Sequence, residues 1–133
     1  MGVQIFLQRA LILWYSKQQN TVEMSMFGSE FVAMKIAIEM IEAFCYKLRM
    51  IEIPLDGKTN VFCDNKSVFK NSMQLESMLK KKHNAIAYHR THEAQAARIV
   101  QIAWETGKTN FADILTKLLL GPWLWFLAQR IIW

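Results

Sequence analysis

Two short apolar runs with β-branched and aromatic residues open the chain. They cover residues 3–7 and 11–15, and the polar stretch at residues 8–10 separates them. Paired runs of this kind around a short break predict a β-hairpin over residues 1–16. A polar connector follows at residues 16–25.

The spacing of apolar residues changes after this connector. They now recur at intervals of four and three, which places them on one face of a helix. The members of this stripe are Phe27, Phe31, Met34, Ile38, Ile41, Cys45 and Leu48. We therefore expect an amphipathic helix over residues 27–50, ended by Pro54 and the turn at Asp56 and Gly57.

Beyond this turn the pattern alternates between strands and helices. It predicts a strand at 59–64, a helix at 82–98, a strand at 99–104 and a C-terminal helical segment at 110–133, which Gly121 and Pro122 interrupt. A short helix through Lys70 would begin with Asn65 or Asp64 as its N-cap. This order predicts an α/β fold, with a mixed sheet flanked by helices, in a single domain over residues 1–133.

Composition is that of a globular chain with a basic surface. The 133 residues are 53% hydrophobic and 20% charged, which argues against disorder and suffices for a core. The net charge of +5 favours a polyanionic partner, although a solvated basic surface explains it equally well. Cys45 and Cys63 show no metal or redox spacing, so we expect an intracellular location, cytoplasmic or nuclear.

Basic side chains concentrate between residues 80 and 92. They are Lys80, Lys81, Lys82, His83, His89, Arg90 and His92. A lysine run is usually solvated, but this one precedes the predicted helix at 82–98, so phosphate contact is the alternative. His83 and His89 do not have the spacing that puts two ligands on one helical face, which disfavours a histidine metal site.

Three carboxylates stand where metal binding is one of two interpretations. Glu30 lies at the edge of the apolar stripe, where a carboxylate needs a metal or partner unless it reaches past the rim to solvent. Asp64 follows a predicted strand, where it could act as a metal ligand or as a helix cap. Asp113 lies in the first turn of a predicted helix, where it could act as a metal ligand or complement the helix dipole. Carboxylates suit Mg²⁺, and two such ions can promote phosphodiester hydrolysis.

Four blocks in a fixed order carry a resemblance over residues 14–117. They are WYSKQQNTV at 14–22 with SEFVA at 29–33, FCDNKS at 62–67, KH at 82–83 with YH at 88–89, and NFADILTK at 110–117. Together they resemble the RNase H domain of copia-type LTR retrotransposon polyproteins. The resemblance implies an RNase H-like fold and hydrolysis of the RNA strand of RNA–DNA hybrids by two Mg²⁺ ions that four carboxylates hold. Glu30, Asp64 and Asp113 stand at three of these catalytic, metal-binding positions.

The fourth carboxylate belongs to the opening strand of the family, ahead of the hairpin. Nothing acidic precedes Glu23 here. Ala85 stands where the family usually has Asp, and Leu118 replaces a common Pro. We therefore expect a copy that lacks the opening strand and is impaired in hydrolysis. The alternative is a non-catalytic remnant that binds nucleic acid or protein.

The resemblance also implies which residues contact nucleic acid and what the partners are. The predicted contacts are Lys80, Lys81, Lys82, His83 and Asn65. The expected partners are an RNA–DNA hybrid or other nucleic acid, and an upstream reverse transcriptase domain or a second copy of the chain. A strand edge left open and an apolar C-terminal segment predict self-association or marginal stability.

The segment at 123–133 is rich in tryptophan. As a helix it would be about 16 Å long, far short of a bilayer core. We expect a terminal helix that packs on the fold or docks on a partner domain, and no membrane contact. Membrane association through this segment is the least favoured of the three functional classes.

Overall fold

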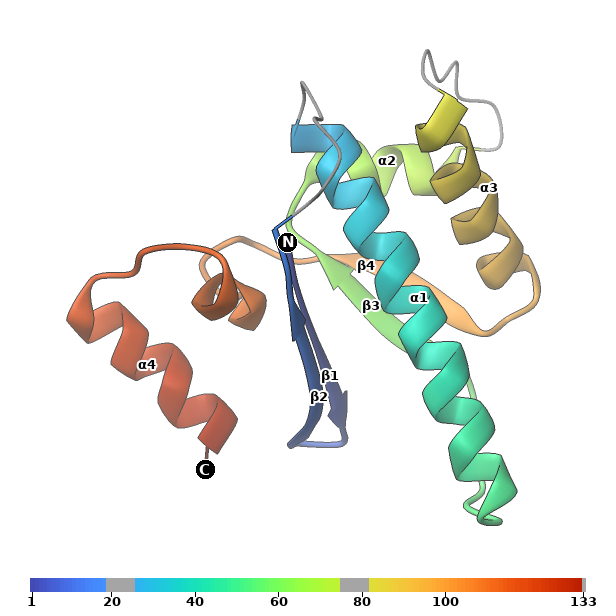
Figure 1. Ribbon diagram of the computed structural model, residues 1–133, viewed down its shortest axis with the longest axis horizontal. Helices are drawn as coiled ribbons and strands as arrows, with labels where there is room; N and C mark the ends of the chain where they lie inside the picture. The colour runs from blue at the N-terminus through green and yellow to red at the C-terminus, as the bar shows by residue number, and fades with distance from the viewer. Residues whose placement is uncertain (19–25, 75–81, 133) are drawn as a thin grey trace. The chain divides into compact units, whose positions relative to one another are not determined.

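The computed structural model describes residues 1–18, 26–74 and 82–132. The chain is mixed α/β, and its described part forms four α-helices and two small sheets (Figure 1). It divides into two compact units, one of residues 1–22 with 105–133 and one of residues 23–104. We call these the split unit and the central unit. The single domain over 1–133 stays a prediction.

Helix α1, Met26–Met50, is the longest element of the central unit. Of the predicted apolar stripe, Phe31, Met34, Ile38, Ile41 and Leu48 are buried, and Cys45 is half-buried. The opposite face carries charge, including the ion pair of Lys35 Nζ with Glu39 Oε1 at 3.4 Å. This division lets one helix cover a core and face water at the same time.

Helix α3, Lys82–Ala96, packs against α1. Its buried residues are mostly small, with Ala87, Thr91 and Ala94 at intervals of four and three. The ring of Tyr88 lies 6.3 Å from that of Phe31 on α1. Small residues let two helix backbones approach closely, so this spacing accounts for the pairing of the helices.

Strands β3, Thr59–Cys63, and β4, Val100–Trp104, form a parallel pair in which Val61 lies opposite Ile102. Helices α2, Lys66–Met73, and α3 lie between them in the chain, as a parallel connection requires. Figure 1 shows α1 crossing this pair of strands. The core of the central unit therefore lies between α1, α3 and one face of the pair.

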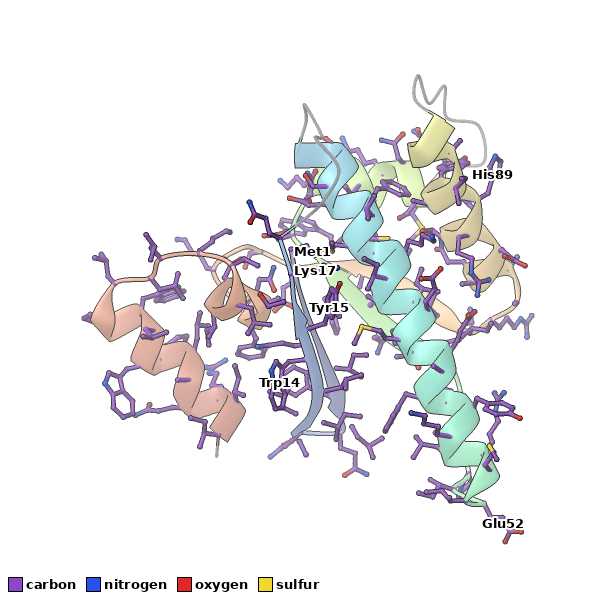
Figure 2. The ribbon with its side chains drawn as sticks, viewed as in Figure 1. Met1, Trp14, Tyr15, Lys17, Glu52 and His89 are labelled. Atoms are coloured by element: carbon purple, nitrogen blue, oxygen red, sulfur yellow. The ribbon has the colours of Figure 1, made fainter. Side chains whose placement is uncertain are left out.

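The split unit begins with the predicted hairpin, which is confirmed. Strands β1, Gly2–Leu7, and β2, Ala10–Ser16, are antiparallel. At its open end Met1 and Lys17 exchange two backbone hydrogen bonds of 3.0 and 3.2 Å (Figure 2).

The 3₁₀-helix η1, Phe111–Leu115, packs on the hairpin, and helix α4, Gly121–Ile132, follows it. Gly2 lies so close to η1 that a Cβ there would come within 3.1 Å of the Ala112 carbonyl oxygen. A side chain at this position would force η1 away from the hairpin.

Several expected boundaries are corrected. The predicted mixed sheet is two separate pairs of strands among the described residues. The helix expected from residue 110 ends at Leu115 as a short 3₁₀-helix. Gly121 and Pro122 open α4 instead of only breaking a helix, because proline fits a first turn where its missing N–H is not needed.

The two long helices of the central unit end in the same way. Arg98 after α3 and Glu52 after α1 have positive φ angles of 57° and 59°. In each case the next residue donates back to the helix, from Ile99 N to Ala94 O and from Ile53 N to Leu48 O, both at 3.0 Å. This left-handed ending stops α3 at Ala96, two residues before the predicted end.

Among the helices that the structure describes, none is long and apolar enough to cross a membrane.

Candidate functional site

Two of the three predicted carboxylates lie in the central unit. Asp64 follows β3 directly and is half-buried. Glu30 is half-buried in the second turn of α1. The end of a parallel strand and the start of a helix packed on it are thus the elements that position this pair.

The pKa of the Cys63 thiol responds to both carboxylates. Its pKa is raised from 9.0 to about 12, first by burial, then by the negative charge of Asp64 and then by that of Glu30. Both carboxylates therefore lie within electrostatic range of the same sulfur atom. Closer convergence of Glu30 and Asp64, as the resemblance implies, stays a prediction.

Contacts from β4 and α2 fix the backbone at Asp64. The Trp104 indole Nε1 donates to the Asp64 carbonyl oxygen at 3.3 Å. Lys66 places its Nζ 4.8 Å from the centre of the Trp104 ring, which is a cation–π contact. This arrangement puts an exposed cationic side chain on the ring that bonds the Asp64 backbone.

Asn65 is the N-cap of α2. Its Oδ1 accepts from the backbone N–H groups of Ser67 at 2.8 Å and Val68 at 3.4 Å. The cap is therefore Asn65 and not Asp64. Since capping uses the oxygen of Asn65, its predicted contact with nucleic acid would come from the Nδ2 group.

Asp113 belongs to the split unit. Only 7% of its surface is exposed, and its Oδ2 accepts from Lys117 Nζ at 2.9 Å. This ion pair supplies a countercharge for the buried carboxylate from within the same segment. Convergence of Asp113 with Glu30 and Asp64 stays a prediction.

The basic segment is only partly described. Lys80 and Lys81 lie outside the described residues, as do the side chains of Lys82 and His83, so their phosphate contact stays a prediction. His89 is exposed on the outer side of α3 (Figure 2).

Two further basic residues of this segment hold the fold together. Arg90 pairs with Glu42 on α1 and, at 2.8 Å, with Glu93. His92 Nε2 lies 3.2 Å from the carbonyl oxygen of Asn71. The cationic cluster in the sequence is therefore not one uniform phosphate-binding surface.

The donor set suits a hard divalent cation. Glu30 and Asp64 offer carboxylate oxygens, the ligands that Mg²⁺ and Mn²⁺ prefer. Burial beside two negative charges raises the pKa of the Cys63 thiol, which favours its protonated form. Over residues 1–18, 26–74 and 82–132, no three His, Cys, Asp or Glu side chains form a group that could hold a metal ion.

Sequence reasoning missed three residues at this site: Cys63, Lys66 and Trp104. The first two lie inside the FCDNKS block and could have been singled out there. Trp104 comes from a strand forty residues away in the chain, and only the register Cys63 to Trp104 brings it near.

No protein-family model matches the chain, and no solved structure matches it.

Proposed function

We propose that this chain is an RNase H-like domain of a copia-type retroelement polyprotein. It would bind an RNA–DNA hybrid and hold a divalent cation at Glu30 and Asp64, with impaired hydrolysis of the RNA strand. The observation that carries the proposal is the position of Asp64, half-buried directly after β3 and in electrostatic range of the Cys63 thiol, as Glu30 is. Metal-dependent phosphodiester hydrolysis needs carboxylates of this kind to hold its cations.

The strand pairing supports the same family. In the RNase H-like fold an opening strand lies between the hairpin and the strand that ends in the second carboxylate. Without that strand, such a sheet would consist of an antiparallel pair and a parallel pair. The chain has these two pairs, β1 with β2 and β3 with β4.

Each residue then has a stated role. Glu30 and Asp64 would bind the cation, which supplies charge neutralisation at the phosphate and a water of lowered pKa. Lys66 would contact the phosphate backbone beside them, with the predicted contacts from Lys80, Lys81, Lys82 and His83. Asp113 would join the ligands only if its carboxylate exchanged Lys117 for the cation. The chain offers three of the four implied carboxylates, which is why we expect impaired hydrolysis.

Metal binding tests the proposal without depending on activity. Titration of the 133-residue chain with Mn²⁺, followed by electron paramagnetic resonance, should show a site that Glu30→Gln or Asp64→Asn weakens by roughly tenfold or more. Asp56→Asn is the matched control, because Asp56 is an exposed carboxylate between α1 and β3. Equal affinity in all four proteins would contradict the assignment of Glu30 and Asp64.

Cleavage of a labelled RNA–DNA hybrid with Mg²⁺ or Mn²⁺ tests the impairment separately. We expect little or no product at enzyme excess. Robust cleavage that disappears in Asp64→Asn would show that the chain is an active enzyme after all.

The ion pair of Asp113 with Lys117 favours the second candidate, a non-catalytic module that binds nucleic acid. Affinity for the hybrid should then fall steeply with salt, since counterion release dominates phosphate contacts. Changing Lys80, Lys81 and Lys82 together to Ala should lower both the affinity and the salt slope. An unchanged slope would exclude the lysine run from the interface.

A further inference from the structure

Helix α2 ends without the left-handed residue that follows α1 and α3. Gln74, after its last turn, is extended, with φ −91° and ψ 124°, and its N–H donates to the Lys70 carbonyl oxygen at 3.2 Å. The last carbonyl oxygens of a helix have no partner within the helix and need other donors. With eight residues α2 is also short, and a helix of that length is marginal on its own. Its C-terminal end therefore depends on groups outside the helix.

Three polar side chains of α3 supply the donors, and we call them the α3 row. They are Tyr88, His92 and Gln95. In this order they bond the carbonyl oxygens of Gln74, Asn71 and Ser72, at 2.5, 3.2 and 2.9 Å. A carbonyl oxygen accepts and cannot donate, so the imidazole carries a hydrogen on Nε2 in its contact. The three positions are four and three residues apart, which places them on one face of α3.

The α3 row differs from the small residues that lie buried along α3. Those residues, each one position ahead of a member of the row, are Ala87, Thr91 and Ala94. The ring of Tyr88 does reach Phe31 on α1, and the ring of His92 lies 4.2 Å from that of Tyr88. The polar atoms of all three members nevertheless bond α2, which packs against α3 (Figure 1). The row therefore joins α3 to one end of α2.

The other end of α2 belongs to the proposed cation site. Asp64 and the cap Asn65 directly precede the helix, and Lys66 is its first residue. Val68 and Ser72 are buried between the two ends, so the helix is packed along its length. At 1.5 Å per residue it is about 12 Å long. A rigid element of this kind carries a displacement of one end to the other.

We infer that the α3 row consists of positioning residues of the proposed cation site. By holding the carbonyl end of α2 against α3, these side chains fix the direction of α2 and so the position of Asp64 and Lys66 at its start. All of these contacts lie within the central unit. The role rests on the proposed function, since it assumes that Asp64 binds the cation.

Hydrogen exchange of the intact, metal-free chain measures whether the row holds α2. Each of three variants removes one donor and keeps a side chain of similar size. They are Tyr88→Phe, His92→Leu and Gln95→Met. The Phe69 amide bonds the Asn65 carbonyl oxygen at 3.0 Å in the first turn of α2. It should exchange roughly fivefold faster in each variant, as the loss of one hydrogen bond implies.

Mn²⁺ binding, followed by electron paramagnetic resonance, measures whether the cation site depends on the row. The same variants should bind Mn²⁺ roughly fivefold more weakly than the wild type. His92→Gln keeps a donor near the place of the imidazole Nε2 and should restore most of the affinity. Arg90→Met is the matched control, because Arg90 also lies on α3 but bonds Glu42 and Glu93. It should leave Phe69 exchange and Mn²⁺ affinity close to those of the wild type.

The two measurements separate this role from the proposed function. Unchanged Phe69 exchange in the three variants would show that the row does not hold α2. Faster exchange with wild-type Mn²⁺ affinity would show that Asp64 keeps its place without the row. Equal effects in Arg90→Met would mean that the row contributes only to the stability of the whole unit. Each of these results overturns the positioning role alone, whereas a wild-type chain that binds no Mn²⁺ contradicts the proposed function and the positioning role with it.

Discussion

Helices α1 and α4 bury their apolar residues to very different extents. In α1 a single stripe is apolar, and the described members that point inward, such as Phe31 and Ile38, are fully buried. In α4 apolar residues lie on all sides, yet only Leu127 is buried. The difference shows that apolar content does not decide burial. A helix is buried where its apolar residues share a face and another element meets that face.

Different contacts join the elements of the two units. Arg90 on α3 reaches Glu42 on α1, so an ion pair joins the two helices beside their apolar contact. In the split unit η1 is held to the hairpin through the close approach at Gly2 and a bond of 3.1 Å from Ser16 Oγ to the Leu115 carbonyl oxygen. We therefore expect mutations to have larger effects in the central unit.

The largest effect should come from Ile38→Ala. Ile38 is fully buried in α1, and its truncation leaves a cavity, so the free energy of unfolding should fall by about 2–5 kcal/mol. Trp125→Ala in α4 removes a larger side chain but a mostly exposed one, and should cost less than about 0.5 kcal/mol. Urea unfolding followed by circular dichroism measures both. A cost for Trp125→Ala that approaches that of Ile38→Ala would mean that α4 is packed and the comparison fails.

A smaller effect should appear at alkaline pH through Cys63. Because its pKa is raised to about 12, the native state keeps a proton that the unfolded chain loses above pH 9. Its contribution to stability is complete below about pH 9 and is lost as the pH rises towards 12. In Cys63→Ala the free energy of unfolding should therefore decline less steeply over this range than in the wild type.

Cys45→Ala is the control, since Cys45 is the other free, half-buried cysteine of the central unit. Urea unfolding at pH 8, 9 and 10 gives the slopes. If Cys63→Ala and the wild type decline in parallel, Cys63 is not desolvated beside the two carboxylates. The proposed assignment of Glu30 and Asp64 to one site would then lose its support.

Much of the local structure follows from the sequence because it depends on neighbours in the chain. The stripe along α1, the hairpin and the cap at Asn65 are all set within a few residues, and each is where the pattern predicts it. The ends of α1 and α3 are harder to predict from the sequence, because Glu52 and Arg98 adopt positive φ angles, which glycine usually adopts at a helix end.

Long-range contacts could not be predicted in this way. Arg90 belongs to a cluster that suggested phosphate binding, but its partner Glu42 lies forty-eight residues away. Likewise the spacing of Glu30 and Asp64 in the sequence does not show that both carboxylates influence the Cys63 thiol. The four-block resemblance singled out these two residues. The C-terminal segment is expected to pack on the fold or to dock on a partner domain, and its residue pattern does not distinguish the two.

The smallest effects should come from two substitutions that relieve the same strain in different units. Arg98, at the end of α3, and Gln8, in the hairpin turn, both have positive φ angles, of 57° and 56°. Glycine adopts this conformation without a steric penalty, so Arg98→Gly and Gln8→Gly should each raise the free energy of unfolding by up to about 1 kcal/mol. The greater conformational entropy that glycine gives the unfolded chain reduces this gain. Native-state hydrogen exchange can locate each gain.

Arg98→Gly should slow exchange at the amides of α3 and β4, which unfold with the core of the central unit. Gln8→Gly should slow exchange in β1 and β2, with no change at α1, if the split unit opens on its own. The control variants Arg98→Ala and Gln8→Ala keep the backbone strain and should bring no gain in stability. A gain from Gln8→Gly that spreads equally to the amides of α1 would show that both units unfold as one, and the contrast between α1 and α4 would then describe two helices of a single cooperative fold.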